Sequence, residues 1–151
     1  MTVLSGATLR AIRPVEPFIE PTRINGMTAG VSHAGYDIRV SQAVMLAPGA
    51  FALASTVERF DMPNDVLGIV HDKSTWARKG LSVFNTVIEP GWRGFLTLEL
   101  VLHSNKGMLI EEGSPIAQVV FHRLDQPVDG YAGKYQDQPD RPVAAILERS
   151  P

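Results

Sequence analysis

Short alternations of apolar and polar residues, rather than long helical periods, run along this chain. The clearest is "GFLTLELVLH" (94–103), in which leucines occupy every second position. Alternation with a period of two places successive side chains on opposite faces of a strand. Thirteen glycines and eleven prolines divide the rest into short pieces. We therefore predict a mostly β fold, a barrel or sandwich of short strands, with further strands in "FALAS" (51–55), "VLGIV" (66–70), "LSVFN" (81–85) and "PIAQVVFHRL" (115–124).

Glu99 lies in the middle of the clearest strand, on the face that also carries Phe95, Thr97 and Val101. A carboxylate there has two interpretations. It is either solvated on an exposed strand face, as most glutamates are, or held inside a pocket. In a pocket, desolvation and fixed geometry would suit it to proton transfer.

The segment "HDKSTWARKGL" (71–81) is the one short helix that we predict. Asp72 is a good N-cap, and Gly80 can end the helix in a left-handed conformation. Ser74 and Arg78 then share one face. The segment is either a solvated surface helix or a phosphate cradle, formed by Lys73, the hydroxyls and free backbone N–H groups.

Composition excludes several classes of function. The net charge of −2 gives no overall attraction for nucleic acid or an anionic membrane. The absence of cysteine excludes disulfides, thiolate nucleophiles and zinc sites that need sulfur, and the four histidines are scattered without ligand spacing. No apolar run approaches a membrane span, and the start lacks a signal-peptide core, so we expect a cytoplasmic protein.

We interpret residues 1–151 as a single domain whose segment 125–151 is a C-terminal tail. This tail is polar and rich in proline and glycine, with no long periodic stretch. Alone it would be disordered, and it could order on a ligand or a neighbouring subunit.

Five segments, in order, resemble motifs of one superfamily: "AGYDIRV" (34–40), "KSTWARKGL" (73–81), "VIEPGWRGFLTLEL" (87–100), "GSPIAQVVFHRL" (113–124) and "YAGKYQDQ" (131–138). The superfamily is that of the trimeric dUTPases and dCTP deaminases. The glutamate at Glu99 and the "GKYQDQP" tail resemble the deaminase branch. The resemblance implies a dUTPase-like, distorted, jelly-roll-like β-barrel with a short helix at the active site, and a tail that closes over that site as a lid.

The resemblance also implies a function, the hydrolysis of dCTP to dUTP and ammonia. It implies a homotrimer with active sites between subunits, and Mg²⁺ bound to the triphosphate only. Zinc deaminases need a cysteine-containing signature, which this chain lacks. A metal-independent route would use Glu99 to shuttle protons, Ser74 to help hold the water, and Arg78 to orient Glu99.

Further substrate-binding residues follow from the same resemblance. Lys73, Ser74 and Thr75 would meet the triphosphate together with Lys134, and Glu89 would lie near the sugar 3′-hydroxyl. The base would contact the backbone of Thr97 and Leu98. The remaining substrate-binding residues are Gln118, Tyr131 and Gln138. Asp37 is either metal-associated, as in dUTPases, or structural.

The loop "SVFNTVI" (82–88) is shorter than its usual counterpart in dCTP deaminases, which positions water and participates in inhibition by dTTP. The sequence therefore leaves two questions open: whether dTTP inhibits the protein, and which base the protein accepts. Two other functions stay open as well. One is dUTP pyrophosphatase activity, alone or after deamination, motivated by Glu89. The other is a non-catalytic nucleotide-binding trimer, motivated by Lys73 where the family usually has arginine.

Overall fold

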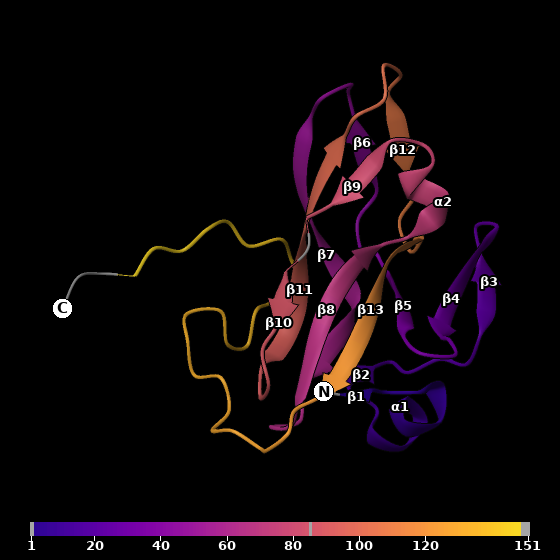
Figure 1. Ribbon diagram of the computed structural model, residues 1–151. Coiled ribbons are helices and arrows are strands. Elements are labelled where there is room, and N and C mark those ends of the chain that lie inside the picture. The colour runs from indigo at the N-terminus through magenta and orange to yellow at the C-terminus, as the bar shows by residue number, and fades with distance from the viewer. Residues whose placement is uncertain (1, 85, 149–151) are drawn as a thin grey trace.

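The computed structural model describes residues 2–84 and 86–148, and most of its regular structure consists of short strands (Figure 1). The mostly β prediction is confirmed. The strands are Thr2–Val3 (β1), Val15–Glu16 (β2), Thr22–Ile24 (β3), Met27–Val31 (β4), Tyr36–Arg39 (β5), Val44–Leu46 (β6), Phe51–Asp61 (β7), Val66–Asp72 (β8), Leu81–Val83 (β9), Val87–Ile88 (β10), Arg93–Leu102 (β11), Met108–Ile110 (β12) and Pro115–Arg123 (β13).

Two antiparallel sheets enclose the core. The larger sheet has the order β10-β8-β13-β5-β4-β3, with β1 added along β13, and the smaller sheet has the order β2-β7-β11-β9. A separate ribbon pairs β12 with β6. Fully buried side chains from both sheets meet between them, among them Phe60 and Leu98 of the smaller sheet and Ile38 and Phe121 of the larger one.

Strand β11 confirms the alternation read from the sequence. Leu96, Leu98, Leu100 and Leu102 are all buried on one face. β11 pairs with β7 on one side and β9 on the other, so that Glu99 lies opposite Leu53. The register of the β11–β7 pair shifts between Phe95 and Thr97, as at a β-bulge. Bulges re-aim side chains near functional sites, and this one directly precedes Thr97 and Glu99.

The chain has a helix that the sequence did not predict, α1 (Gly6–Ile12). The Ser5 side chain accepts a hydrogen bond from the backbone N–H of Thr8 (3.3 Å), which caps the first turn. Leu9 lies on the buried face of α1. The helix ends at Arg13, which has a left-handed conformation with φ of 45°.

The predicted helix in the 71–81 segment is shorter than expected and is capped differently. α2 spans Ser74–Ala77, and its N-cap is Lys73, which makes no side-chain capping hydrogen bond. The prediction that Asp72 caps it is wrong, because a carboxylate oxygen of Asp72 instead accepts from the backbone N–H of Val83 (2.7 Å). Gly80 does follow in a left-handed conformation, with φ of 91°.

The predicted strand 51–55 is the start of β7, which continues to Asp61. Of the predicted strand 81–85, β9 covers Leu81–Val83, and Asn85 lies outside the described residues. The described helices are all too short to cross a membrane.

Candidate functional site

A pocket of about 480 Å³ lies between β10, the central part of β11 and the C-terminal segment. The turn 89–92 joins the two strands, so Glu89 of the turn and Glu99 of β11 line the pocket from one strand–turn–strand unit. Most of the lining is apolar, and the polar groups are few. The lining residues are Phe51, Leu53, Thr86, Val87, Ile88, Glu89, Trp92, Leu96, Thr97, Glu99, Tyr131, Tyr135, Gln138, Val143, Ala144 and Ala145.

Glu99 is the titratable group whose environment in this pocket is most unusual. It is partly buried, and burial raises the pKa of its carboxyl group, while a hydrogen bond from its own backbone lowers it by less. Among the described residues, no cation lies within ion-pair distance of it. Of the two interpretations of Glu99, the structure supports the carboxylate held in a pocket.

Thr97 and Gln138 lie beside Glu99. The Thr97 hydroxyl donates to the side-chain carbonyl of Gln138 (3.1 Å) and accepts from the backbone N–H of Val143 (3.1 Å). Thr97 shares a face of β11 with Glu99, whereas the side chain of Leu98 points into the core. A backbone role for Leu98 therefore fits its position better than a side-chain role.

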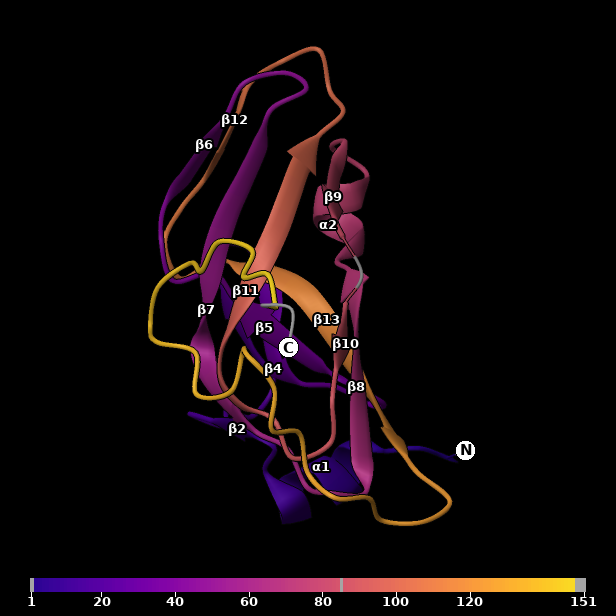
Figure 2. The same cartoon turned by 90° about the vertical axis from the view of Figure 1, so that its left-hand side faces the viewer.

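The C-terminal tail packs on its own chain instead of standing free. Figure 2 shows it crossing in front of β7 and β11. Gln138 forms an isolated parallel bridge with Gly94, and its carbonyl accepts from the backbone N–H of Phe95 (3.1 Å). Tyr131 and Gln138 both line the pocket.

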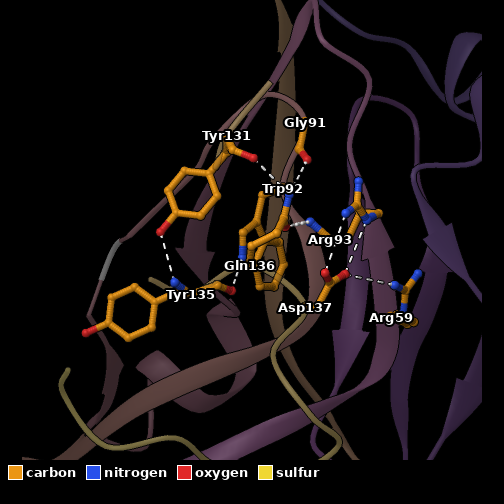
Figure 3. Close-up of polar contacts among 8 residues, drawn as sticks. All are labelled: Arg59, Gly91, Trp92, Arg93, Tyr131, Tyr135, Gln136 and Asp137. Carbon is orange, nitrogen blue, oxygen red and sulfur yellow. Dashed lines mark hydrogen bonds and ion pairs between the residues drawn. The ribbon is translucent and has the colours of Figure 1, made fainter. Parts of the chain in front are cut away.

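Trp92, the last residue of the 89–92 turn, holds the tail by a hydrogen bond (Figure 3). Its indole N–H donates to the carbonyl of Tyr135 (2.6 Å), and the backbone N–H of Tyr135 donates to the phenol of Tyr131 (3.1 Å). The sequence did not assign Tyr135 to the site. The available signal was Trp92 itself, since a buried indole N–H usually has a partner.

Lys73 is directed away from this pocket. It is 8% exposed, its ammonium lies 3.2 Å from a carboxylate oxygen of Asp37, and it donates to the Thr28 hydroxyl (2.9 Å). Asp37 therefore has a structural partner in this chain. A phosphate contact by Lys73 would compete with that ion pair.

The other predicted residues lie outside the Glu99 pocket of the single chain. No described hydrogen bond or ion pair joins Ser74 or Arg78 to Glu99, and neither lines its pocket. Thr75 lines a separate hollow beside the β3–β4 turn. Gln118 lies on β13, opposite Asp37 of β5 and His71 of β8. Its side-chain amide donates to the Ser32 hydroxyl (3.4 Å).

Lys134 belongs to the tail, where its ammonium lies 5.4 Å above the ring of Tyr135 and 4.0 Å from a carboxylate oxygen of Glu148. Within residues 2–84 and 86–148, no group of three or more His, Cys, Asp or Glu side chains forms a metal site. The single chain thus brings together Glu89, Thr97, Glu99, Tyr131 and Gln138.

Sequence comparison identifies close relatives over most of the chain. A family profile described as "dCTP deaminase-like" matches residues 36–124. A dCTP deaminase of Campylobacter fetus is 36% identical, covering 89% of this chain and 90% of the relative. A dCTP deaminase of Pyrococcus horikoshii is 34% identical, covering 81% of this chain and 83% of the relative.

Structure comparison confirms the predicted dUTPase-like fold. The dUTPase of phage phi11 of S. aureus superposes with a TM-score of 0.59 at 20% identity, over 79% of this chain and 92% of that one. The dUTPase of EIAV gives a TM-score of 0.59 at 17% identity, over 81% of this chain and 97% of that one. At these identities the likeness concerns the fold alone.

Proposed function

Because this chain belongs to the dCTP deaminase family, and is an enzyme of that type, we propose that the pocket around Glu99 is where dCTP is hydrolysed to dUTP and ammonia. The observation that carries the assignment to this pocket is Glu99 itself. It is a partly buried carboxyl group with a raised pKa, set among apolar side chains and without a cationic partner among the described residues.

The reaction adds water at C4 of cytosine, moves a proton to N3, and releases ammonia. A carboxyl group with a raised pKa is well matched to this work, since it can take a proton from water and return it to the base or the leaving amine. The apolar lining excludes bulk water and strengthens each polar contact inside. Thr97 and Gln138 supply the polar groups that would orient the base.

We further propose that the active unit is a homotrimer, with residues 125–151 serving as its lid. Ser74 and Arg78 would reach Glu99 from a neighbouring subunit, since neither lines its pocket within one chain. Phe51 and Phe84, which are 57% and 52% exposed and stack near the pocket, offer an apolar surface for such contact. Thr75, Gln118 and Lys134 would meet the triphosphate, and Lys73 would do so if released from Asp37.

Mg²⁺ would bind to the triphosphate of the substrate and reduce its charge. A dUTPase of the same fold is described with a structural Mg(II) ion. The enzyme would act in the cytoplasm.

A second activity, the hydrolysis of dUTP to dUMP and pyrophosphate, is favoured by one observation. Glu89 lines the same pocket as Glu99. It would orient a second water molecule toward the phosphates. Glutamate is one methylene longer than the aspartate of bifunctional relatives, so we rank this activity second.

Product analysis tests both activities. Purified protein is incubated with dCTP, CTP, dUTP or dCMP, and the products are resolved by chromatography. Formation of dUTP and ammonia from dCTP is the expected result. The appearance of dUMP and pyrophosphate would add the second activity, and binding of triphosphate without any product would indicate a non-catalytic nucleotide-binding protein.

A further inference from the structure

Strands β7 and β11 run side by side (Figure 2) and change their register shortly before Glu99. At that point one residue of β11, Leu96, faces three residues of β7 (56–58), so β7 carries two residues more than β11. We propose that Thr56 is a positioning residue: its buried hydroxyl holds this bulge, and the bulge determines which side chain lies opposite Glu99. The effect on catalysis rests on the proposed function, whereas the bulge and its contacts do not.

The bulge changes the neighbour of Glu99 across the strand pair. On the N-terminal side of the bulge in β11, Phe95 lies opposite Arg59. If that register continued without a bulge, Ser55 would lie opposite Glu99. The two extra residues of β7 place Leu53 there instead. Because directly opposite residues of an antiparallel pair share a face, an apolar side chain takes the place of a hydroxyl beside the carboxyl group.

The pocket shows the result of this offset. Leu53 and Phe51, two residues apart on β7, both line the pocket with Glu99. Ser55 is instead fully buried outside the pocket lining, where its hydroxyl accepts a hydrogen bond from the side-chain amide of Gln42 (2.6 Å). Apolar surroundings disfavour an ionised carboxylate, in agreement with the raised pKa of Glu99, for which burial is the main cause.

Thr56 is fully buried and uses its hydroxyl both as an acceptor and as a donor within the bulge. The oxygen accepts from the backbone N–H of Leu96 (3.0 Å), and the hydroxyl proton is donated to the carbonyl of Glu58 (2.7 Å). A bulge interrupts the ladder of backbone hydrogen bonds, and here one side chain supplies partners to two of the backbone groups concerned. A valine of nearly the same shape would leave both groups buried and unpaired.

Contacts with the larger sheet hold the same bulge from the other side. Thr56 forms an isolated antiparallel bridge with Val40, the residue after β5. The carboxylate of Glu58, which is fully buried, accepts from the backbone N–H of Arg39 (2.9 Å) and from its guanidinium (2.8 Å). The polar side chains of the bulge are therefore paired inside the core, as buried polar groups need to be.

NMR titration of the Glu99 carboxyl carbon, assigned with Glu99→Gln, tests the placement without substrate. Leu53→Ser puts a hydroxyl opposite Glu99 and should lower its pKa toward the ordinary value, because a hydroxyl can donate to the ionised form. Thr56→Val should lower the pKa in the same direction, since Leu53 is no longer held in place. Thr56→Ser keeps the hydroxyl and should leave the pKa unchanged. Thr56→Ala removes the hydroxyl without inserting a methyl group, and it should act as Thr56→Val does.

A double variant tests whether Thr56 acts through Leu53. If it does, Thr56→Val should lower the pKa of Glu99 no further in a Leu53→Ser background. Amide hydrogen exchange at Leu96 should rise about fivefold in Thr56→Val, because one backbone hydrogen bond is lost. Thr22→Val is the matched control, since Thr22 is exposed on β3 and has no described side-chain hydrogen bond. The control should change neither quantity.

Steady-state kinetics with dCTP separates positioning from a loss of folded protein. In Thr56→Val, kcat should fall at least about tenfold while KM changes by less than about threefold. The acid limb of kcat/KM against pH should move to lower pH, and Thr56→Ser should restore both the rate and the profile. A lower kcat with an unmoved pH profile would indicate loss of folded enzyme and would overturn the positioning role.

The proposed function and the positioning role can fail separately. If the unmodified protein releases no ammonia from dCTP while the pKa of Glu99 still falls in Thr56→Val and Leu53→Ser, the proposed function is wrong and the placement of Glu99 by the bulge stands. If dCTP is deaminated and the pKa of Glu99 is the same in every variant, the proposed function stands and Thr56 does not position Glu99.

Discussion

Replacing Glu99 with glutamine should lower activity and raise stability at the same time. Glutamine keeps the shape of the side chain but cannot exchange a proton with water or substrate. The loss of a positioned general acid–base typically costs ~10²–10⁴-fold in rate, so kcat for dCTP should fall by about a thousandfold. Ammonia release measured with a coupled assay at saturating dCTP gives this number.

The stability change follows from the raised pKa of Glu99. A carboxyl group that holds its proton more tightly in the folded state stabilises that state only below its unfolded pKa, and this contribution is lost as the pH rises through the folded pKa. Above its unfolded pKa, Glu99 therefore opposes folding. Removing a charge that opposes folding should therefore raise Tm, and in a chain of this size ~1 kcal/mol shifts Tm by about 2–4 °C.

The variant should then melt above the unmodified protein at pH 7 and at nearly the same temperature near pH 4, as measured by calorimetry. Glu112→Gln is the matched control, since Glu112 is exposed in the turn between β12 and β13. That control should change neither Tm nor turnover. A turnover of Glu99→Gln within about fivefold of the unmodified enzyme would refute the reasoning, as would a lower Tm at pH 7.

Three further predictions address the ion pair in the core, the tail and the metal. Arg39→Ala leaves Glu58, which is fully buried, without its guanidinium partner at 2.8 Å, so the free energy of unfolding should fall by about 3 kcal/mol at pH 7. Burial raises the pKa of Glu58, and the loss should shrink in acid, where the carboxyl group is neutral; an equal loss at pH 4 and pH 7 in urea titrations would contradict this. Gly94→Ala puts a methyl group 2.6 Å from the backbone nitrogen of Gln138 at a φ of 140°, and should raise KM for dCTP about tenfold; an unchanged KM would show that the tail is not part of the binding wall. EDTA should suppress deamination of dCTP and added Mg²⁺ should restore it, whereas 1,10-phenanthroline, which prefers zinc, should have no effect; the opposite pattern would show that the chemistry needs a transition metal.

The sequence was most informative where local pattern alone decides structure. The alternation in 94–103 identified β11 and its buried leucine face, and Gly80 follows α2 in the left-handed conformation expected of it. The same alternation places Glu99 on the opposite face of that strand. Whether that face is solvated or enclosed depends on the tail, which lies far away in the sequence.

Interactions between distant segments were not visible in the pattern. Aspartate is a residue type that favours the N-cap position. The carboxylate of Asp72 instead accepts a hydrogen bond from the backbone N–H of Val83, because this distant partner competes for the same oxygen. Helix α1 was missed because it is short and its stabilising contacts, such as Leu9 with the core, are tertiary. The docking of the tail through Gln136 likewise depends on backbone groups some 45 residues earlier in the chain.

The resemblance of the five motifs predicted the reaction, which the periodicity of apolar residues could not predict. The comparisons confirm the family and the fold. Glu89, Thr97, Glu99, Tyr131 and Gln138 share one pocket in the single chain, whereas the roles of Ser74 and Arg78 beside Glu99 depend on the proposed trimer.

The most direct test of the central claim is the fate of solvent oxygen when dCTP is the substrate. The protein is incubated with dCTP and Mg²⁺ in oxygen-18-labelled water, and the products are fragmented by mass spectrometry. Hydrolytic deamination predicts dUTP that carries one labelled oxygen on the uracil ring, together with free ammonia. Unlabelled dCTP after prolonged incubation, or label found only in phosphate, would contradict the account.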